Sequence, residues 1–235
     1  GTILLTGPKS ELLIANLTDD KTDVSNFPWL THKEINLCNE KCRVLKVSYA
    51  GEKGFEIHIA NNSMSKVYNE LIKFGENYDL VHFGMLALDS MRLEKNYRSW
   101  KSDLTSDYSI LQSGLDRWIN FSKESFIGKE ALTRESEIGV TKKFVTLVVD
   151  DPEDNKAFGE PVYLSPVFAG DKYLGPVVSS GYGHRVKKSI SMAILDDRNL
   201  DGLNDQLHID VLGRKRKAHI VKEALYDPEN NRLRS

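Results

Sequence analysis

The chain opens on an apolar, strand-like run, and two further β-rich runs follow it. Residues 3–6, 43–49 and 55–60 are rich in β-branched and aromatic residues, and we expect each to form a strand. The second and third runs flank a short turn that contains Gly51 and Gly54. The sequence therefore predicts a hairpin whose two arms meet at a glycine-containing turn.

The apolar period then changes to that of a helix. Ser63 has the chemistry of an N-cap and Gly75 that of a C-terminal stop, and apolar residues between them recur every three or four positions. A second helix is predicted over residues 85–95, where Asp89 precedes Arg92 by about one turn. The sequence leaves two interpretations of this pair open: an ion pair that stabilises a buried helix, or ligand-binding side chains.

Strand-like alternation returns after residue 140. Before it lie an aromatic-rich connection at residues 101–121 and a short predicted helix at residues 126–137. Gly, Asp and Asn turns separate the later predicted strands, which occupy residues 142–151, 173–181, 189–195, 207–212 and 218–222. Short strands at this spacing are typical of a compact antiparallel barrel or sandwich. We predict two domains, residues 1–140 and 141–235.

The composition of the chain is that of an ordinary globular protein. Its 235 residues are 40% hydrophobic and 28% charged, and the formal net charge is −2. This charge provides no steering toward nucleic acid, and a solvated hairpin tip explains the basic run at residues 214–217. No apolar run approaches the roughly 18 residues of a membrane-spanning helix, and no signal segment opens the chain. We expect a cytoplasmic protein that binds neither nucleic acid nor membrane.

Two cysteines bear on metal binding. Cys38 and Cys42 are too few for a secreted disulfide framework. No second pair of Cys or His residues stands at ligand spacing, and His32 is the only histidine near them in the sequence. We therefore expect reduced thiols and no metal site.

The chain lacks the motifs of several reaction classes. It contains no G-x-S-x-G nucleophile elbow, no G-x-x-x-x-G-K-[ST] phosphate loop and no H-E-x-x-H zinc helix. The remaining candidate chemistry is aromatic and acidic, and it rests on Tyr49, Glu56, Tyr97 and Trp100. A carboxylate accepts two parallel hydrogen bonds from a flat heterocycle with adjacent N–H donors, while an aromatic ring stacks on its face. The residues alone are equally compatible with an edge hairpin that carries a surface glutamate.

Six segments carry a family resemblance. They read YAGEKGFEIHI, DSMRLEKNYRSWKSDLT, SGL, FIGKEAL, VVSSGYGHRVKKSISMAIL and LYDPENNRLR. In this order they resemble the tetrahydrofolate-binding part of the glycine-cleavage T-protein (aminomethyltransferase) family, over essentially the whole chain. YRSW, GYGH and LYDPENNRLR are most similar to the folate-binding C-terminal domain of dimethylglycine and sarcosine dehydrogenases. The resemblance implies an α+β, ferredoxin-like folate-binding region followed by a C-terminal antiparallel β-barrel.

The resemblance also implies a binding site. In that family the Tyr and Glu of the Y-x-G-E-x-G-[YWF]-E motif contact the pterin, which implies cofactor-binding roles for Tyr49 and Glu56. Trp100 falls where the family places an aromatic residue near the ligand, and tetrahydrofolate is the implied cofactor. The family's catalytic acid lies in a part of the fold that precedes the match to Gly1, so no catalytic residue is identified. Leu88 stands where the glycine-cleavage proteins have an arginine.

Two functions follow from the resemblance. The first is one-carbon transfer from an amine such as glycine, sarcosine or dimethylglycine to tetrahydrofolate, with a flavoprotein dehydrogenase subunit or a second copy as partner. The second is a non-catalytic interaction or assembly subunit of a flavin-dependent amine-oxidising complex, with a vestigial folate pocket. The sequence leaves open whether the chain is an enzyme and which amine it uses. It also leaves open whether the chain, which opens on an apolar run without an initiating methionine, is a piece of a longer protein.

Overall fold

Two units make up the part of the chain that the structure, a computed structural model, describes: residues 1–18, 24, 27–150, 159–196 and 200–234. The first unit combines Gly1–Lys95 with Tyr226–Ser235, and the second is Asn96–Leu225. These units divide the chain differently from the predicted domain boundary near residue 140. The predicted domain boundary near residue 140 therefore stays a prediction.

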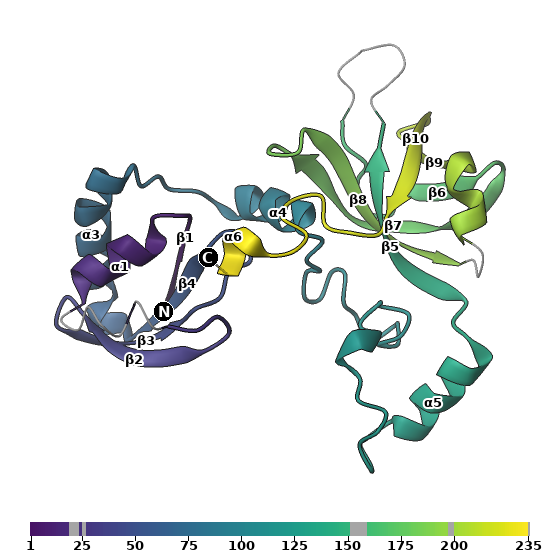
Figure 1. The fold of residues 1–235 in the computed structure, drawn as a ribbon. Coiled ribbons are helices and arrows are strands. Elements are labelled where there is room, and N and C mark those ends of the chain that lie inside the picture. Colours follow the sequence, from purple (N-terminus) through teal and green to yellow (C-terminus); the bar gives the residue numbers. More distant parts are fainter. Residues whose placement is uncertain (19–23, 25–26, 151–158, 197–199, 235) are drawn as a thin grey trace. The chain divides into compact units, whose positions relative to one another are not determined.

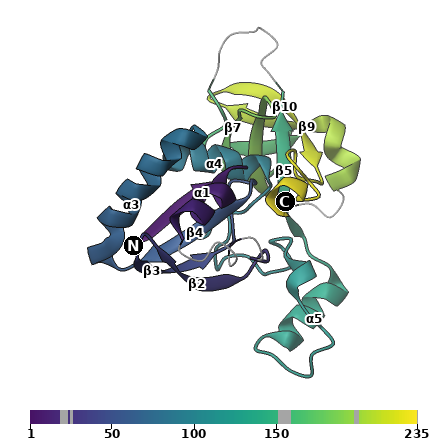
Figure 2. The same ribbon diagram turned by 60° about the vertical axis from the view of Figure 1, so that its left-hand side comes forward.

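A four-stranded antiparallel sheet is the framework of the first unit (Figures 1 and 2). Strands β1 to β4 lie in the spatial order β1-β4-β3-β2, and their bounds are Thr2–Thr6, His32–Leu37, Glu40–Leu45 and Gly54–Ile59. The helices α1 (Ser10–Leu17) and α3 (Asn61–Gly75) pack on one face of this sheet.

The alternation of side chains along the strands gives the sheet two different faces. On β4, Phe55, Ile57 and Ile59 are buried, whereas Glu56 and His58 point to the opposite side. The buried side chains of the sheet and of both helices form one apolar core, which includes Leu5, Leu13, Ile14, Leu37, Val44, Phe55, Ile57, Val67 and Leu71. The opposite side is half to largely exposed, and we call it the open face.

Short helices and a returning C-terminal segment complete the first unit. η1 (Glu76–Tyr78) follows α3. The helix α4 (Met85–Glu94) lies at the end of the stretch Gly1–Lys95, and α6 (Asn231–Arg234) lies in the returning segment. The two helices predicted in this unit are confirmed, and α3 ends at Gly75 as predicted. The predicted cap is wrong, because α3 begins at Asn61 and the hydroxyl of Ser63 instead donates to Oε2 of Glu40 at 2.5 Å.

A closed six-stranded antiparallel barrel forms most of the second unit (Figure 1). Strands β5 to β10 lie in the order β10-β5-β8-β7-β6-β9, with bounds Lys142–Val149, Pro166–Ala169, Lys172–Gly183, Lys188–Asp196, Leu207–Val211 and Arg214–Val221. η2 (Asp116–Trp118) and α5 (Lys129–Ile138) precede the barrel, and η3 (Leu200–Gln206) lies between β8 and β9. The predicted α+β fold with a C-terminal antiparallel barrel is confirmed.

The strand prediction for residues 43–49 is too long. β3 ends at Leu45, so Tyr49 lies in the loop that follows the strand. β2 and β6 were not predicted. β2 carries only two fully buried side chains, Ile35 and Leu37, and β6 has four residues and opens on a proline.

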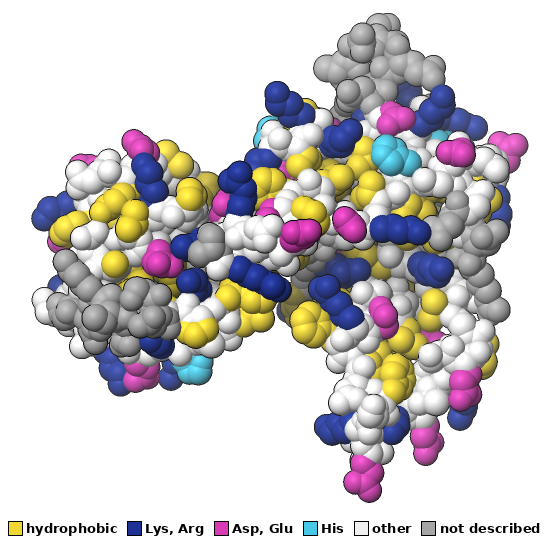
Figure 3. All heavy atoms as spheres, viewed as in Figure 1, with side chains coloured by type: hydrophobic (Ala, Val, Ile, Leu, Met, Phe, Trp, Pro, Cys, Tyr) yellow, Lys and Arg dark blue, Asp and Glu magenta, His cyan; other side chains and the backbone are white. Residues whose placement is uncertain are grey.

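In the basic run at residues 214–217, Arg214, Lys215 and Lys217 are exposed beside the turn of the β9–β10 hairpin, as predicted, whereas Arg216 is not. These residues begin β10 and pair with β9. Arg216 is buried, and its guanidinium donates to the carbonyl oxygens of Asp150 and Gly159. On the face drawn in Figure 3, basic and acidic side chains are interspersed rather than separated.

Candidate functional site

Two glycines determine the shape of the loop at residues 46–53, which joins β3 to β4 and which we call the Tyr49 loop. Gly51 has a φ of +79°, in the left-handed region that favours glycine. At Gly54 the chain approaches β1 so closely that a Cβ would stand 3.0 Å from the carbonyl oxygen of Leu5. Gly51 is therefore favoured by its backbone conformation, and Gly54 by its close packing against β1.

Tyr49 itself is held by well-fixed neighbours. The hydroxyl of Ser48 lies 3.2 Å from that of Thr6 and accepts a hydrogen bond from the N–H of Ala50 at 3.3 Å. Ala50 is buried, whereas Tyr49 is 36% exposed. A fixed backbone that carries a partly exposed aromatic ring suits a stacking contact with a flat ligand.

Glu56 lies in the middle of β4, on the open face. In the register of the sheet it stands opposite Leu4 of β1 and opposite Leu45 of β3. Leu4 is 42% exposed and the Glu56 side chain is 35% exposed. One carboxylate is therefore flanked on both sides by apolar side chains. This arrangement offers a flat ring an apolar bed with a hydrogen-bond acceptor at its centre.

His58 accompanies Glu56 on the same face, two residues further along β4. Its Nε2 lies 3.4 Å from Oε2 of Glu56, and its Nδ1 lies 3.4 Å from the hydroxyl of Thr2. Arg43, opposite His58 in the register, pairs with Glu34 at 3.4 Å. His58 was not predicted as a site residue, although the period of two along a strand places it beside Glu56.

Trp100 belongs to the second unit, whereas the other two predicted site residues share one hairpin of the first. It forms an isolated bridge with Leu104 and is 77% exposed. Nearby, the buried carboxylate of Asp103 accepts hydrogen bonds from the N–H of Ser99 at 2.7 Å and from the hydroxyl of Ser179. The backbone around Trp100 is thus anchored to the barrel. The ligand-binding role of Trp100 stays a prediction.

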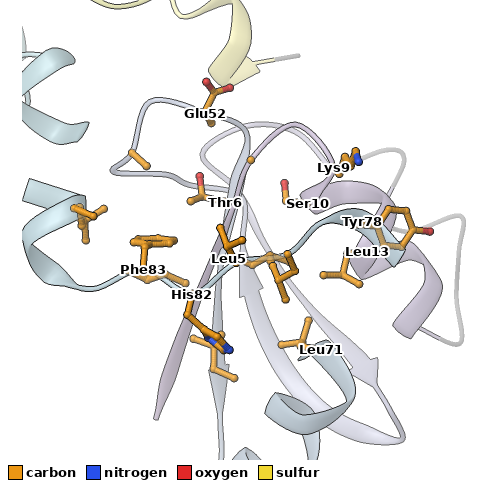
Figure 4. Close-up of a pocket in the computed structure, with 18 of the residues that line it drawn as sticks. Leu5, Thr6, Lys9, Ser10, Leu13, Glu52, Leu71, Tyr78, His82 and Phe83 are labelled. Atoms are coloured by element: carbon orange, nitrogen blue, oxygen red, sulfur yellow. The ribbon is translucent and has the colours of Figure 1, made fainter. Parts of the chain in front are cut away.

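A cavity of about 840 Å³ lies beside the hairpin of Tyr49 and Glu56 in the first unit, and its lining includes Leu4, Ala50 and Glu52 (Figure 4). Apolar side chains from β1, α1, α3 and the segment 79–84 form most of its lining, including Leu5, Leu13, Leu71 and Phe83. The predicted site residues are not among those that line it. This cavity could not be predicted from the sequence, because segments that are distant in the sequence form it together.

The predicted pair on α4 is an intrahelical ion pair. Nε of Arg92 donates to Oδ1 of Asp89 at 2.7 Å, and the Arg92 side chain is 3% exposed. This geometry confirms the interpretation as an ion pair, on a helix that is buried only toward its C-terminal end.

The two cysteines are free thiols. Burial raises the pKa of the Cys42 thiol. Within the described residues, no group of three or more His, Cys, Asp or Glu side chains is placed to hold a metal ion. None of the described helices has the length and apolar character needed to cross a bilayer.

Comparisons with known proteins identify the family. The GCVT N-terminal domain matches residues 1–123, and the glycine cleavage T-protein C-terminal barrel domain matches residues 142–227. The aminomethyltransferase of Alkaliphilus oremlandii is 31% identical over 226 residues, which cover 95% of this chain and 59% of that protein. The mitochondrial dimethylglycine and sarcosine dehydrogenases of Mus musculus are 27% and 28% identical over 100% of this chain and 26% of each dehydrogenase.

The fold agrees with this assignment. The glycine cleavage system aminomethyltransferase T of Bartonella henselae superposes with a TM-score of 0.78 over 97% of this chain and 60% of that one, at 18% identity. An α+β unit and a closed antiparallel barrel thus define an aminomethyltransferase-type fold. The chain belongs to the glycine cleavage T-protein family. It spans about three fifths of the length of the aminomethyltransferases and about a quarter of the dehydrogenases.

Proposed function

We propose that the chain binds tetrahydrofolate on the hairpin of Tyr49 and Glu56. In this proposal it takes part in transferring a one-carbon unit to folate from an amine such as glycine, sarcosine or dimethylglycine. The observation that carries the proposal is the position of Glu56, a half-exposed carboxylate between Leu4 and Leu45 on the open face. The names of the aminomethyltransferase and dehydrogenase relatives support the same chemistry.

The residues of the hairpin fit the chemistry of a pterin. Glu56 has two acceptor oxygens, which match adjacent ring N–H and amino donors, and charge-assisted hydrogen bonds of this kind are strong. Tyr49 offers a ring face, and Leu4 and Leu45 offer apolar contacts for a flat heterocycle. Tetrahydrofolate, when bound, supplies the nitrogen that accepts the one-carbon unit. The hairpin residues bind and orient it, and Trp100 is proposed as a further contact.

Replacement of Glu56 tests this proposal. We expect the chain to bind 5-formyltetrahydrofolate and the Glu56→Ala variant to lose about 1.5–3 kcal/mol, roughly ten- to a hundredfold in Kd, because a hydrogen bond to a charged group is removed. Isothermal titration calorimetry under reducing conditions measures both. Glu76→Ala, at an exposed position of η1, is the matched control and should leave the affinity unchanged. Equal affinity of Glu56→Ala and the unchanged chain would refute the pterin contact.

A second function is favoured by the apolar cavity. Val81, Met85 and Leu86, beside the cavity or in its lining, are 75%, 75% and 90% exposed. Exposed apolar side chains around a cavity are typical of a surface that another polypeptide covers. The alternative proposal is therefore an assembly subunit of a flavin-dependent amine-oxidising complex, whose partner is a flavoprotein dehydrogenase subunit or a second copy. A chain that binds no folate but co-purifies as a defined complex would favour it.

We also propose a cytoplasmic location for the folate-binding chain. The dehydrogenase relatives are mitochondrial proteins, so fractionation of the source cells distinguishes the two compartments.

A further inference from the structure

A buried lysine connects the Tyr49 loop to the residues at 226–234, which we call the C-terminal segment. The side chain of Lys95 is 1% exposed. Its ammonium donates to the carbonyl oxygen of Asp227 at 2.5 Å and to Oδ1 of Asn230 at 2.8 Å, and it lies 3.7 Å from Oδ2 of Asp227. A buried ammonium is stable only when its donors are satisfied. Lys95 therefore fixes the C-terminal segment against the end of α4.

The stem of the same lysine lies against the Tyr49 loop. A Cβ placed on Gly51 would come within 2.4 Å of Cγ and 2.6 Å of Cδ of Lys95, so the side chain packs directly on the Gly51 backbone. The next residue, Glu52, accepts a hydrogen bond from the hydroxyl of Tyr226. The N–H of Tyr226 in turn donates to the carbonyl oxygen of Glu94 at 3.0 Å. Two contacts thus join the loop to residues that are far away in the sequence.

The C-terminal segment is itself well ordered by local contacts. The carboxylate of Asp227 accepts hydrogen bonds from the N–H groups of Asn231 at 2.9 Å and Arg232 at 3.1 Å, at the start of α6. Leu233 is buried, and the guanidinium of Arg234 lies 4.9 Å from the centre of the Trp29 ring. The segment is therefore a fixed support rather than a loose tail.

We propose that the C-terminal segment is a positioning element of the folate site. Through Lys95 and Tyr226 it holds residues 49–53 in the conformation that presents Tyr49 to the pterin. This inference rests on the proposed function. Its physical basis is preorganisation, because a loop that is already fixed loses less conformational entropy when a ligand binds. Tyr226 and Lys95 act through the loop and are positioning residues, not ligand contacts.

Variants of the hydrogen bond between Tyr226 and Glu52 test the proposal in the full chain. Tyr226→Phe and Glu52→Ala each remove the bond, whereas Glu52→Gln keeps an acceptor oxygen for the tyrosine hydroxyl. Tyr173→Phe, at an exposed tyrosine of the barrel, is the control. Two quantities are measured for each chain: hydrogen exchange of the amides at residues 49–53 and of β4, and affinity for 5-formyltetrahydrofolate.

We expect exchange at residues 49–53 to become about tenfold faster in Tyr226→Phe and Glu52→Ala, with the amides of β4 unchanged. The affinity of these two variants should fall about three- to tenfold, with Glu52→Gln and Tyr173→Phe close to the unchanged chain. The affinity of the double variant Tyr226→Phe/Glu52→Ala should be no lower than that of either single variant, because both substitutions remove the same hydrogen bond.

Other results separate the failure of this inference from that of the proposed function. Unchanged exchange at residues 49–53 would overturn the positioning role. Faster exchange with undiminished affinity would also overturn it, since the bond would then serve stability alone. If the unchanged chain binds no 5-formyltetrahydrofolate, the proposed function is refuted. Faster exchange confined to residues 49–53 in the variants would still show that the Tyr49 loop is attached to the C-terminal segment.

Discussion

Replacing Gly51 with alanine adds one methyl group at the point where the Tyr49 loop meets Lys95. The substitution has two separate effects in the structure. Gly51 has a φ of +79°, which a residue with a Cβ adopts only at a cost. The new methyl group would also stand 2.4 Å from Cγ of Lys95. The lysine stem has little freedom to move aside, because its ammonium is hydrogen-bonded to Asp227 and Asn230 at its other end.

The expected loss of stability follows from adding these two effects. A left-handed backbone costs a non-glycine residue about 1–2 kcal/mol. Forcing an extra methyl group into a closely packed site costs about 1–3 kcal/mol more. Gly51→Ala should therefore destabilise the first unit by about 2–5 kcal/mol. Gly213→Ala is the matched control, because Gly213 has a φ of +81° and a methyl group added there would meet no atom within 4 Å, so it should cost only about 1–2 kcal/mol.

Hydrogen exchange of the slowest amides in each unit measures these two losses by the same method, since it reports the free energy of opening unit by unit. The difference between the two substitutions isolates the contact with Lys95. A difference of less than about 0.5 kcal/mol would mean that the lysine stem yields freely, and the close packing of the loop on Lys95 would be refuted.

Three further predictions concern Cys42 and the barrel. Because burial raises the pKa of the Cys42 thiol, iodoacetamide at pH 8 should modify the partly exposed Cys38 at least about tenfold faster, as peptide mass spectrometry would show; equal rates would contradict the burial. The Cys42 thiol ionises at a lower pH in the unfolded chain than in the folded one. The stability that the buried, neutral thiol contributes should therefore be lost as the pH rises above about 8.5. Urea titrations of Cys42→Ala should not show this loss. Leu147 is 0% exposed in the barrel core, so Leu147→Ala should lower the free energy of unfolding by about 2–5 kcal/mol. A loss below about 1 kcal/mol in urea unfolding would contradict its place in the core.

The sequence predicted best those elements that bury only one face, because their apolar and polar residues then alternate with a clear period. β4 alternates Phe55, Ile57 and Ile59 with polar residues because only one of its faces meets the helices. The end of α3 at Gly75 was equally visible. Its start was not, because the hydroxyl of Ser63 bonds to Glu40, a residue on a strand that the local pattern does not connect to the helix.

Features that depend on distant parts of the chain could not be predicted. Arg216 looked like a solvated charge, but carbonyl oxygens of Asp150 and Gly159 satisfy its guanidinium inside the structure. In the candidate site, the hairpin and its two glycines followed from the sequence. The apolar bed around Glu56 did not, because it depends on the spatial order of the strands, which places β1 and β3 on either side of β4. The ligand contacts of Tyr49, Glu56 and Trp100 stay predictions.

The return of the C-terminal segment to the first unit has a consequence for synthesis of the protein. The second unit, Asn96–Leu225, is one uninterrupted stretch, whereas the first is divided around it. A ribosome adds residues in order, and units fold as their residues emerge. Lys95 therefore leaves the ribosome long before Asp227 and Asn230, the residues that satisfy its ammonium once it is buried. The described strands of the barrel have all emerged by then, so the order of translation lets the second unit fold before the first unit, with its candidate ligand site, is completed.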